Sequence, residues 1–231
     1  VLLAYYIATV NIENIYHDLN NEKEYKEFKG ICLTDTFQLG EDKKELQLIP
    51  TSFKENSERV KRQKNAPLQI IFGNPPYSAK QKSENDNAQN DIYPLLNKRI
   101  KETYVENGTA QNKNSLYDSY IKAFRWATDR LNNNVGGIIA FITNNGWIDS
   151  LSSDGFRKTI EKEFSSVYIL DLKGAIRGKN GDLAKKEGEN IFPIMTGVCI
   201  TILVKKPKNN KEKADIFYYS VQDYLKKNEK L

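Results

Sequence analysis

An apolar run that ends in two consecutive prolines constrains this 231-residue chain more than any other stretch. Residues 70–73 (IIFG) predict a short strand, and residues 74–77 (NPPY) follow it as a polar corner with an aromatic tip. Proline fixes its own φ and restricts the residue before it to extended conformations. Asn74 and Pro75 are therefore held more tightly than ordinary loop residues, and we expect a rigid site at the end of this strand.

Apolar strand patterns alternate with helical patterns along the rest of the chain. Strands are predicted at residues 30–34, 138–142, 167–172, 197–204 and 216–219, and helices at 2–19, 115–133, 152–164 and from Ser220 onward. This alternation predicts the α/β class, in which the polar ends of successive strands meet at one edge of the sheet. The chain is long enough for one sizeable domain, and a single domain over residues 1–231 is expected.

Composition excludes little. A net charge of +5 with a pI near 8.9 permits a nucleic-acid partner without requiring one. A basic cluster at Arg59, Lys61, Arg62 and Lys64 could follow a phosphate backbone, but a solvated helix face is the favoured interpretation. No apolar run is long enough for a membrane span and no signal peptide is visible, so a cytoplasmic protein is expected.

Metal chemistry is not predicted. A single histidine, His17, cannot build a histidine-based metal site alone. Cys32 and Cys199 each lie inside an apolar run, where a thiol is usually a small buried hydrophobic group.

The proline corner suits chemistry on a planar amine such as the N6 group of adenine, whose lone pair is delocalised into the ring. The Asn74 side-chain oxygen and the Pro75 carbonyl could each accept one N–H and draw the nitrogen toward tetrahedral geometry. Pro76 stiffens the corner, and Tyr77 offers a flat face on which a base could stack. A base in a duplex would have to be flipped out first.

These residues resemble the catalytic motif of the amino-group methyltransferases, chiefly the N6-adenine DNA methyltransferases. The stretches LTDTF (33–37), SLY (115–117), FITNNGW (141–147) and IFP (191–193) also fall in that family's order. In particular, the chain resembles the methyltransferase part of large single-polypeptide restriction-modification enzymes. The resemblance implies a Rossmann-like, S-adenosylmethionine-dependent fold, double-stranded DNA as substrate, and further domains in a larger parent polypeptide.

The resemblance also implies roles for single residues. Asn74 and Pro75 would bind the target amine, with Tyr77 and Phe192 as aromatic walls around the flipped base. On the donor side, the residues implied are Asp35 for the adenine amino group of S-adenosylmethionine, Phe37 beside that ring and Tyr120 packed near the cofactor. From the residues alone, Asp35 is equally well explained as a turn cap.

One feature of the family is missing. No glycine-rich turn follows a strand here, so we expect an N-terminally truncated catalytic domain, running from a strand that ends at Asp35 to a terminal strand and helix. Such a fragment should bind S-adenosylmethionine weakly, lack activity by itself and expose sheet edges.

Two alternative functions stay open. The same motif could serve another amine or amide, such as a protein glutamine, guanine N2 in RNA or cytosine N4. Alternatively, the chain could be a non-catalytic DNA-binding module that uses the basic cluster.

Overall fold

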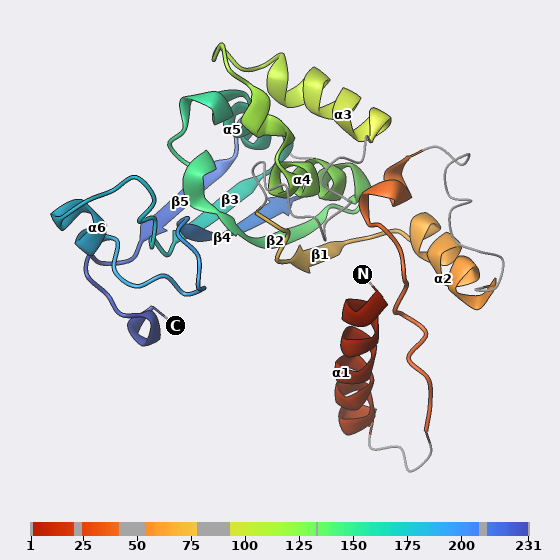
Figure 1. Cartoon of the computed structure of the whole chain (residues 1–231). Helices are drawn as coiled ribbons and strands as arrows, with labels where there is room; N and C mark the ends of the chain where they lie inside the picture. The colour runs from red at the N-terminus through yellow and green to blue at the C-terminus, as the bar shows by residue number, and fades with distance from the viewer. Residues whose placement is uncertain are drawn as a thin grey trace. The chain divides into compact units, whose positions relative to one another are not determined.

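A computed structural model describes residues 2–20, 25–41, 54–77, 93–132, 134–207 and 212–230 (Figure 1). The chain divides into two compact units, residues 1–66 and residues 67–231. Each unit is described by itself.

The first unit contains the helices α1 (Leu2–Asn20) and α2 (Lys54–Asn65), with a short 3-10 helix at Phe37–Gly40. Helix α1 confirms the helix predicted at residues 2–19. Its apolar side chains remain exposed, however, and Leu3 and Leu19 keep 72% and 78% of their surface accessible. No residue of α1 is buried in the first unit.

The strand predicted at residues 30–34 is wrong, because the segment is irregular up to Asp35. Its backbone is paired by side chains of α2 in place of a neighbouring strand. The Asn56 amide accepts the Leu33 N–H at 2.8 Å and donates to the Leu33 carbonyl at 2.9 Å, and Gln63 donates to the Gly30 carbonyl. One amide thus satisfies both backbone groups of Leu33 as a strand neighbour would, which removes the need for a sheet.

The second unit is built on a five-stranded sheet in the order β1-β2-β4-β3-β5 (Figure 1). The strands are β1 (Ile70–Gly73), β2 (Gly137–Asn144), β3 (Ser166–Asp171), β4 (Val198–Lys205) and β5 (Asp215–Ser220). β1 runs parallel to β2 and β3 runs parallel to β5, whereas β4 is antiparallel to both of its neighbours. The carboxyl ends of β1, β2, β3 and β5 and the start of β4 therefore lie at one edge, as predicted.

Helices and short turns connect these strands. They are α3 (Pro94–Ile100) with a π-helical turn at Lys101–Val105, α4 (Ser119–Arg130), α5 (Asp154–Glu163), α6 (Asp182–Lys186), and 3-10 turns at Asn114–Tyr117, Asn145–Trp147, Leu151–Ser153 and Lys227–Glu229. α4 begins four residues later than predicted, because the Ser115 hydroxyl hydrogen-bonds the Ser152 hydroxyl at 2.8 Å. The terminal helix predicted from Ser220 is wrong, since the described residues beyond β5 form only the short turn at Lys227–Glu229.

The hydrophobic core lies between the sheet and the helices α4 and α5, which cover one sheet face in Figure 1. Phe124 of α4 is fully buried and packs against Phe141, Trp147 and Phe156, with ring centroids 5.2–6.3 Å apart. These tilted and edge-on contacts fix α4 and α5 against the same side of β2. The helices thus fix the position of the sheet edge at which β1, β2, β3 and β5 end.

The opposite face of the sheet carries a row of apolar side chains in register across all five strands. Phe72 pairs with Ala140, which is followed across the sheet by Ile202, Tyr168 and Phe217. Phe72 is 80% exposed and Phe217 is 51% exposed. Among the described residues, β1 forms one edge of the sheet, which agrees with the expected exposure of sheet edges.

Candidate active site

The proline corner lies directly after β1, at the edge where the strand ends meet. Gly73 pairs with Phe141 of β2, so Asn74 leaves the sheet beside the last three residues of β2. The Tyr77 hydroxyl donates to the Asn74 side-chain oxygen at 2.7 Å. This bond turns the Asn74 oxygen toward the tyrosine and leaves its second lone pair for another donor.

Burial favours the protonated form of the Tyr77 hydroxyl. The phenol is half-buried, and desolvation followed by the nearby Cys199 thiol raises the pKa of Tyr77 to about 12. The hydroxyl is therefore a hydrogen-bond donor at any physiological pH. Asn74 itself is exposed.

The thiol of Cys199 contributes to the electrostatics of this corner. Cys199 is fully buried on β4, with the Thr143 hydroxyl 3.5 Å from its sulfur, as expected for a cysteine that acts as a small buried group. Cys199 contributes to the electrostatics of both Tyr77 and Tyr120 of α4. Burial, and then the charge of Asp118, raise the pKa of Tyr120.

Phe192 belongs to the same edge. Its ring is partly buried against a cluster formed by Leu172, Ile191, Val198 and Val221, which also contacts Ile142 at the end of β2. Asn74 and Phe192 are therefore both placed beside the carboxyl-terminal end of β2. Asn74 and Tyr77 are hydrogen-bonded to each other, whereas the roles of these residues and of Phe192 toward a target base stay predictions.

Asp35 and Phe37 lie in the first unit, whereas the other predicted site residues lie in the second. The Asp35 carboxylate accepts the Phe37 N–H at 2.9 Å and so caps the 3-10 helix that begins there. The interpretation of Asp35 as a turn cap is thus observed. A role toward a cofactor stays a prediction.

The structure adds one residue that the sequence did not single out, Asp171. The Asp171 carboxylate, at the end of β3, accepts the Asn145 amide at 2.8 Å, the Lys173 N–H at 3.0 Å and the Tyr218 hydroxyl at 3.2 Å. It therefore ties the ends of β2, β3 and β5 together. The only signal in the sequence was that Asp171 is a polar residue at the end of an apolar run. Its side-chain partners Asn145 and Tyr218 lie 26 and 47 positions away.

The basic cluster on α2 is largely engaged within the first unit. Arg59 pairs with Glu27, Arg62 donates to the Lys29 carbonyl at 2.6 Å, and Lys64 donates to the Glu41 carbonyl at 2.9 Å. These three side chains stabilise the irregular segment 25–41. Their contacts therefore favour a structural helix face over a surface that binds phosphates.

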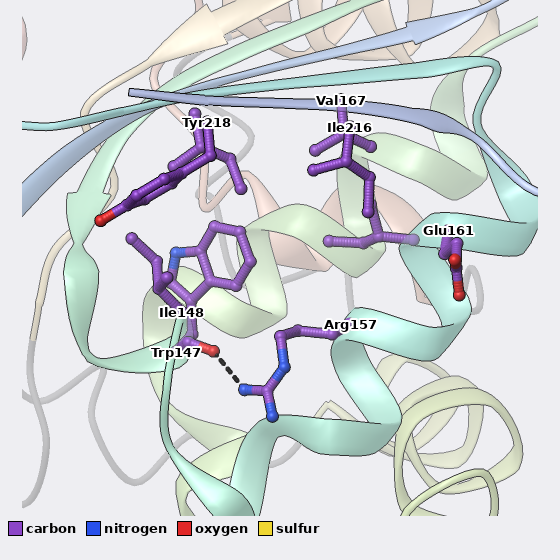
Figure 2. Close-up of a pocket in the computed structure, with 9 residues that line it drawn as sticks. Trp147, Ile148, Arg157, Glu161, Val167, Ile216 and Tyr218 are labelled. Carbon is purple, nitrogen blue, oxygen red and sulfur yellow. Dashed lines mark hydrogen bonds between the residues drawn. The ribbon is translucent and has the colours of Figure 1, made fainter. Parts of the chain in front are cut away.

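A separate apolar pocket lies between α5 and the strands β3 and β5 (Figure 2). Its volume is about 240 Å³, and it is lined by Trp147, Ile148, Arg157, Ile160, Glu161, Val167, Ile169, Ile216 and Tyr218. Arg157 closes one side by donating to the Trp147 carbonyl at 2.7 Å (Figure 2). None of the predicted site residues lines this pocket, so it is distinct from the proline corner.

The described part of the chain holds no cluster of three or more histidine, cysteine, aspartate or glutamate side chains suited to a metal ion. Within the same residues, no helix has the length and apolar character needed to cross a membrane.

Comparison with known proteins points to one family. Residues 3–176 match the family described as Eco57I restriction-modification methylase, whereas no curated protein matched the chain.

Three solved structures are similar over the whole chain. They are described as the ATP-dependent Type ISP restriction-modification enzyme LlaBIII bound to DNA (46% identity, TM-score 0.91), a nuclease-deletion mutant of the Type ISP restriction-modification enzyme LlaGI in complex with a DNA substrate mimic (43%, 0.89), and a DrdV-DNA complex (42%, 0.85). The chain covers 15%, 18% and 21% of these longer chains. These similarities confirm the α/β class and agree with the Rossmann-like methyltransferase fold.

Proposed function

Since this chain belongs to the Eco57I restriction-modification methylase family, we propose that it forms the target-amine side of a DNA methyltransferase site. The reaction is the transfer of a methyl group from S-adenosylmethionine to the N6 amino group of a flipped adenine. The parent polypeptide acts in restriction-modification, as the enzymes similar to it do.

The observation that carries this proposal is the arrangement of Asn74 and Tyr77. The hydroxyl of Tyr77 is 2.7 Å from the Asn74 side-chain oxygen, so an acceptor and an aromatic face are held side by side on a proline-stiffened corner. A base stacked on the Tyr77 ring presents its exocyclic amine to that oxygen. Stacking on one aromatic side chain contributes about 1–3 kcal/mol per base.

The chain's own residues prepare the amine for attack. Asn74 accepts one N–H through its second lone pair, and the Pro75 carbonyl accepts the other. Together they draw the nitrogen out of conjugation, so its lone pair points away from the ring plane. Phe192 closes the opposite side of the base.

The described residues provide less of a site for the methyl donor, S-adenosylmethionine. Tyr120 is only 5% exposed and offers little surface to a cofactor ring, and Asp35 serves as a turn cap in the first unit. These residues do not make a cofactor pocket by themselves. S-adenosylmethionine is proposed as the donor from the family, and no catalytic step is assigned to Asp35, Phe37 or Tyr120.

The acceptor can be tested directly. The complete enzyme is incubated with methyl-labelled S-adenosylmethionine and, separately, double-stranded DNA, RNA or protein, and the methylated group is identified by mass spectrometry. We expect N6-methyladenine in DNA. Label in cytosine N4, guanine N2 or glutamine would reassign the acceptor, and salt-sensitive DNA binding without any transfer would support a non-catalytic module.

A further inference from the structure

The turn that carries Phe192 is held by one side-chain amide, that of Asn190. Its nitrogen donates to the Thr196 carbonyl at 2.7 Å and to the Gly174 carbonyl at 3.0 Å, while its oxygen accepts the Phe192 N–H at 3.0 Å. Both amide protons and one acceptor position of Asn190 are therefore used. The three bonds join the two ends of the turn to the loop that follows β3.

That loop has the shape needed to receive Asn190. Gly174 has a φ of +87°, and a Cβ added there would lie 2.9 Å from the Asn190 Cα, Cγ and Nδ2 atoms. Only glycine combines this backbone conformation with so close an approach. Lys173, the preceding residue, also has a positive φ of 56°, and its N–H is fixed by Asp171.

Further hydrogen bonds connect this loop to the end of β2. Asp171 accepts the Asn145 amide, and the Asn145 N–H donates to the Gly197 carbonyl at 3.0 Å. Phe192 is therefore connected through Asn190, the Gly174 loop and Asp171 to the edge at which Asn74 leaves the sheet. A wall that must meet a flipped base needs such support, because the ring is only partly buried by its own packing.

We propose that Asn190 is a positioning residue, which fixes the Phe192 ring as one wall of the target-base site. The inference rests on the proposed function, since it concerns how the base is held. Asparagine is suited to the task because one planar amide supplies two donors and an acceptor at once. Aspartate lacks the donors, and leucine lacks all three groups.

The test is a double-mutant cycle in the complete enzyme, with kcat/KM for DNA methylation as the readout. Asn190→Ala and Phe192→Ala should each lower kcat/KM for DNA by about 5- to 150-fold, the range implied by loss of one base–aromatic stack. The double variant should be no worse than Phe192→Ala alone, because both changes remove the same contact. Affinity for S-adenosylmethionine should stay unchanged.

Two further variants keep the result interpretable. Asn190→Ser retains a hydroxyl that can accept the Phe192 N–H but cannot span to Gly174 and Thr196, so it should give an intermediate loss even if Asn190→Ala folds poorly. Asn132→Ala is the matched control, because Asn132 makes a similar bond to the Asn134 N–H outside the site. It should keep wild-type kcat/KM.

The outcomes separate the two proposals. If the wild-type enzyme transfers no methyl group to DNA, the proposed function fails and this inference fails with it. If the wild type is active but Asn190→Ala is unimpaired, or if the losses of Asn190→Ala and Phe192→Ala multiply, the positioning role alone is wrong.

Discussion

Replacing Tyr77 separates the contribution of its hydroxyl from that of its ring. Tyr77→Phe removes the 2.7 Å bond to Asn74 and keeps the aromatic face. A neutral hydrogen bond contributes about 0.5–1.5 kcal/mol net, and water can replace the lost donor at the exposed Asn74. We therefore expect Tyr77→Phe to lower the free energy of unfolding by less than about 1 kcal/mol.

Activity should distinguish the same two groups. Tyr77→Ala loses base stacking, worth about 1–3 kcal/mol, so kcat/KM for DNA methylation should fall by roughly 5- to 150-fold. Tyr77→Phe should stay within about 5-fold of wild type, because Asn74 keeps both lone pairs for the amine. Steady-state methylation by the complete enzyme measures both. Equal losses in the two variants would refute the argument, since the hydroxyl would then be essential in itself.

The pH dependence of stability provides a further check on Tyr77. Burial raises the pKa of Tyr77 to about 12 in the folded state, from an ordinary value of 10.0. The stability that the protonated hydroxyl provides is therefore complete below pH 10 and is lost as the pH rises toward 12. The stability difference between wild type and Tyr77→Phe should be constant from pH 6 to 9 and shrink above 10; a change near neutral pH would contradict this assignment.

Four other substitutions test the fold by chemical denaturation and hydrogen exchange. Phe124→Ala should cost about 3–5 kcal/mol of stability and Phe72→Ala less than about 1 kcal/mol, because the first ring is fully buried and the second is 80% exposed; similar costs would contradict the assigned sheet faces. Asn56→Ala should speed amide exchange at Leu33, whose N–H it binds at 2.8 Å, and unchanged exchange would show that the bond is not formed. Arg125→Met should cost about 3 kcal/mol, since this 1%-exposed guanidinium pairs with two carboxylates, and a neutral effect would mean that packing replaces the ion pairs.

The sequence predicted the second unit well because its signals are local. Apolar runs such as residues 138–142 and 198–204 are long and β-branched, and polar residues follow each strand at the shared edge. The rigid corner at residues 74–77 was also predictable from the sequence, since proline restricts its neighbours regardless of tertiary context.

Other features depend on partners distant in the sequence. The pattern of residues 30–34 predicts a strand, but the Asn56 amide pairs with the Leu33 backbone across 23 positions. Tertiary hydrogen bonding therefore prevails over strand propensity. The role of Asp171 was likewise invisible, because its partners Asn145 and Tyr218 lie 26 and 47 positions away. From the sequence, Asp35 has two equally good interpretations, a cofactor contact and a turn cap, because nothing in the pattern fixes the partner of its carboxylate.

The most direct test of the account is Asn74→Ala in the complete enzyme, assayed for methyl transfer and for cofactor binding. The substitution removes the side-chain oxygen that accepts the Tyr77 hydroxyl at 2.7 Å and, in our proposal, the target amine. We predict that methyl transfer to DNA falls by about 100-fold or more, as expected when a positioning acceptor in the transition state is lost, while the Kd for S-adenosylmethionine changes less than about 3-fold. Transfer close to the wild-type rate would contradict the central role of the corner.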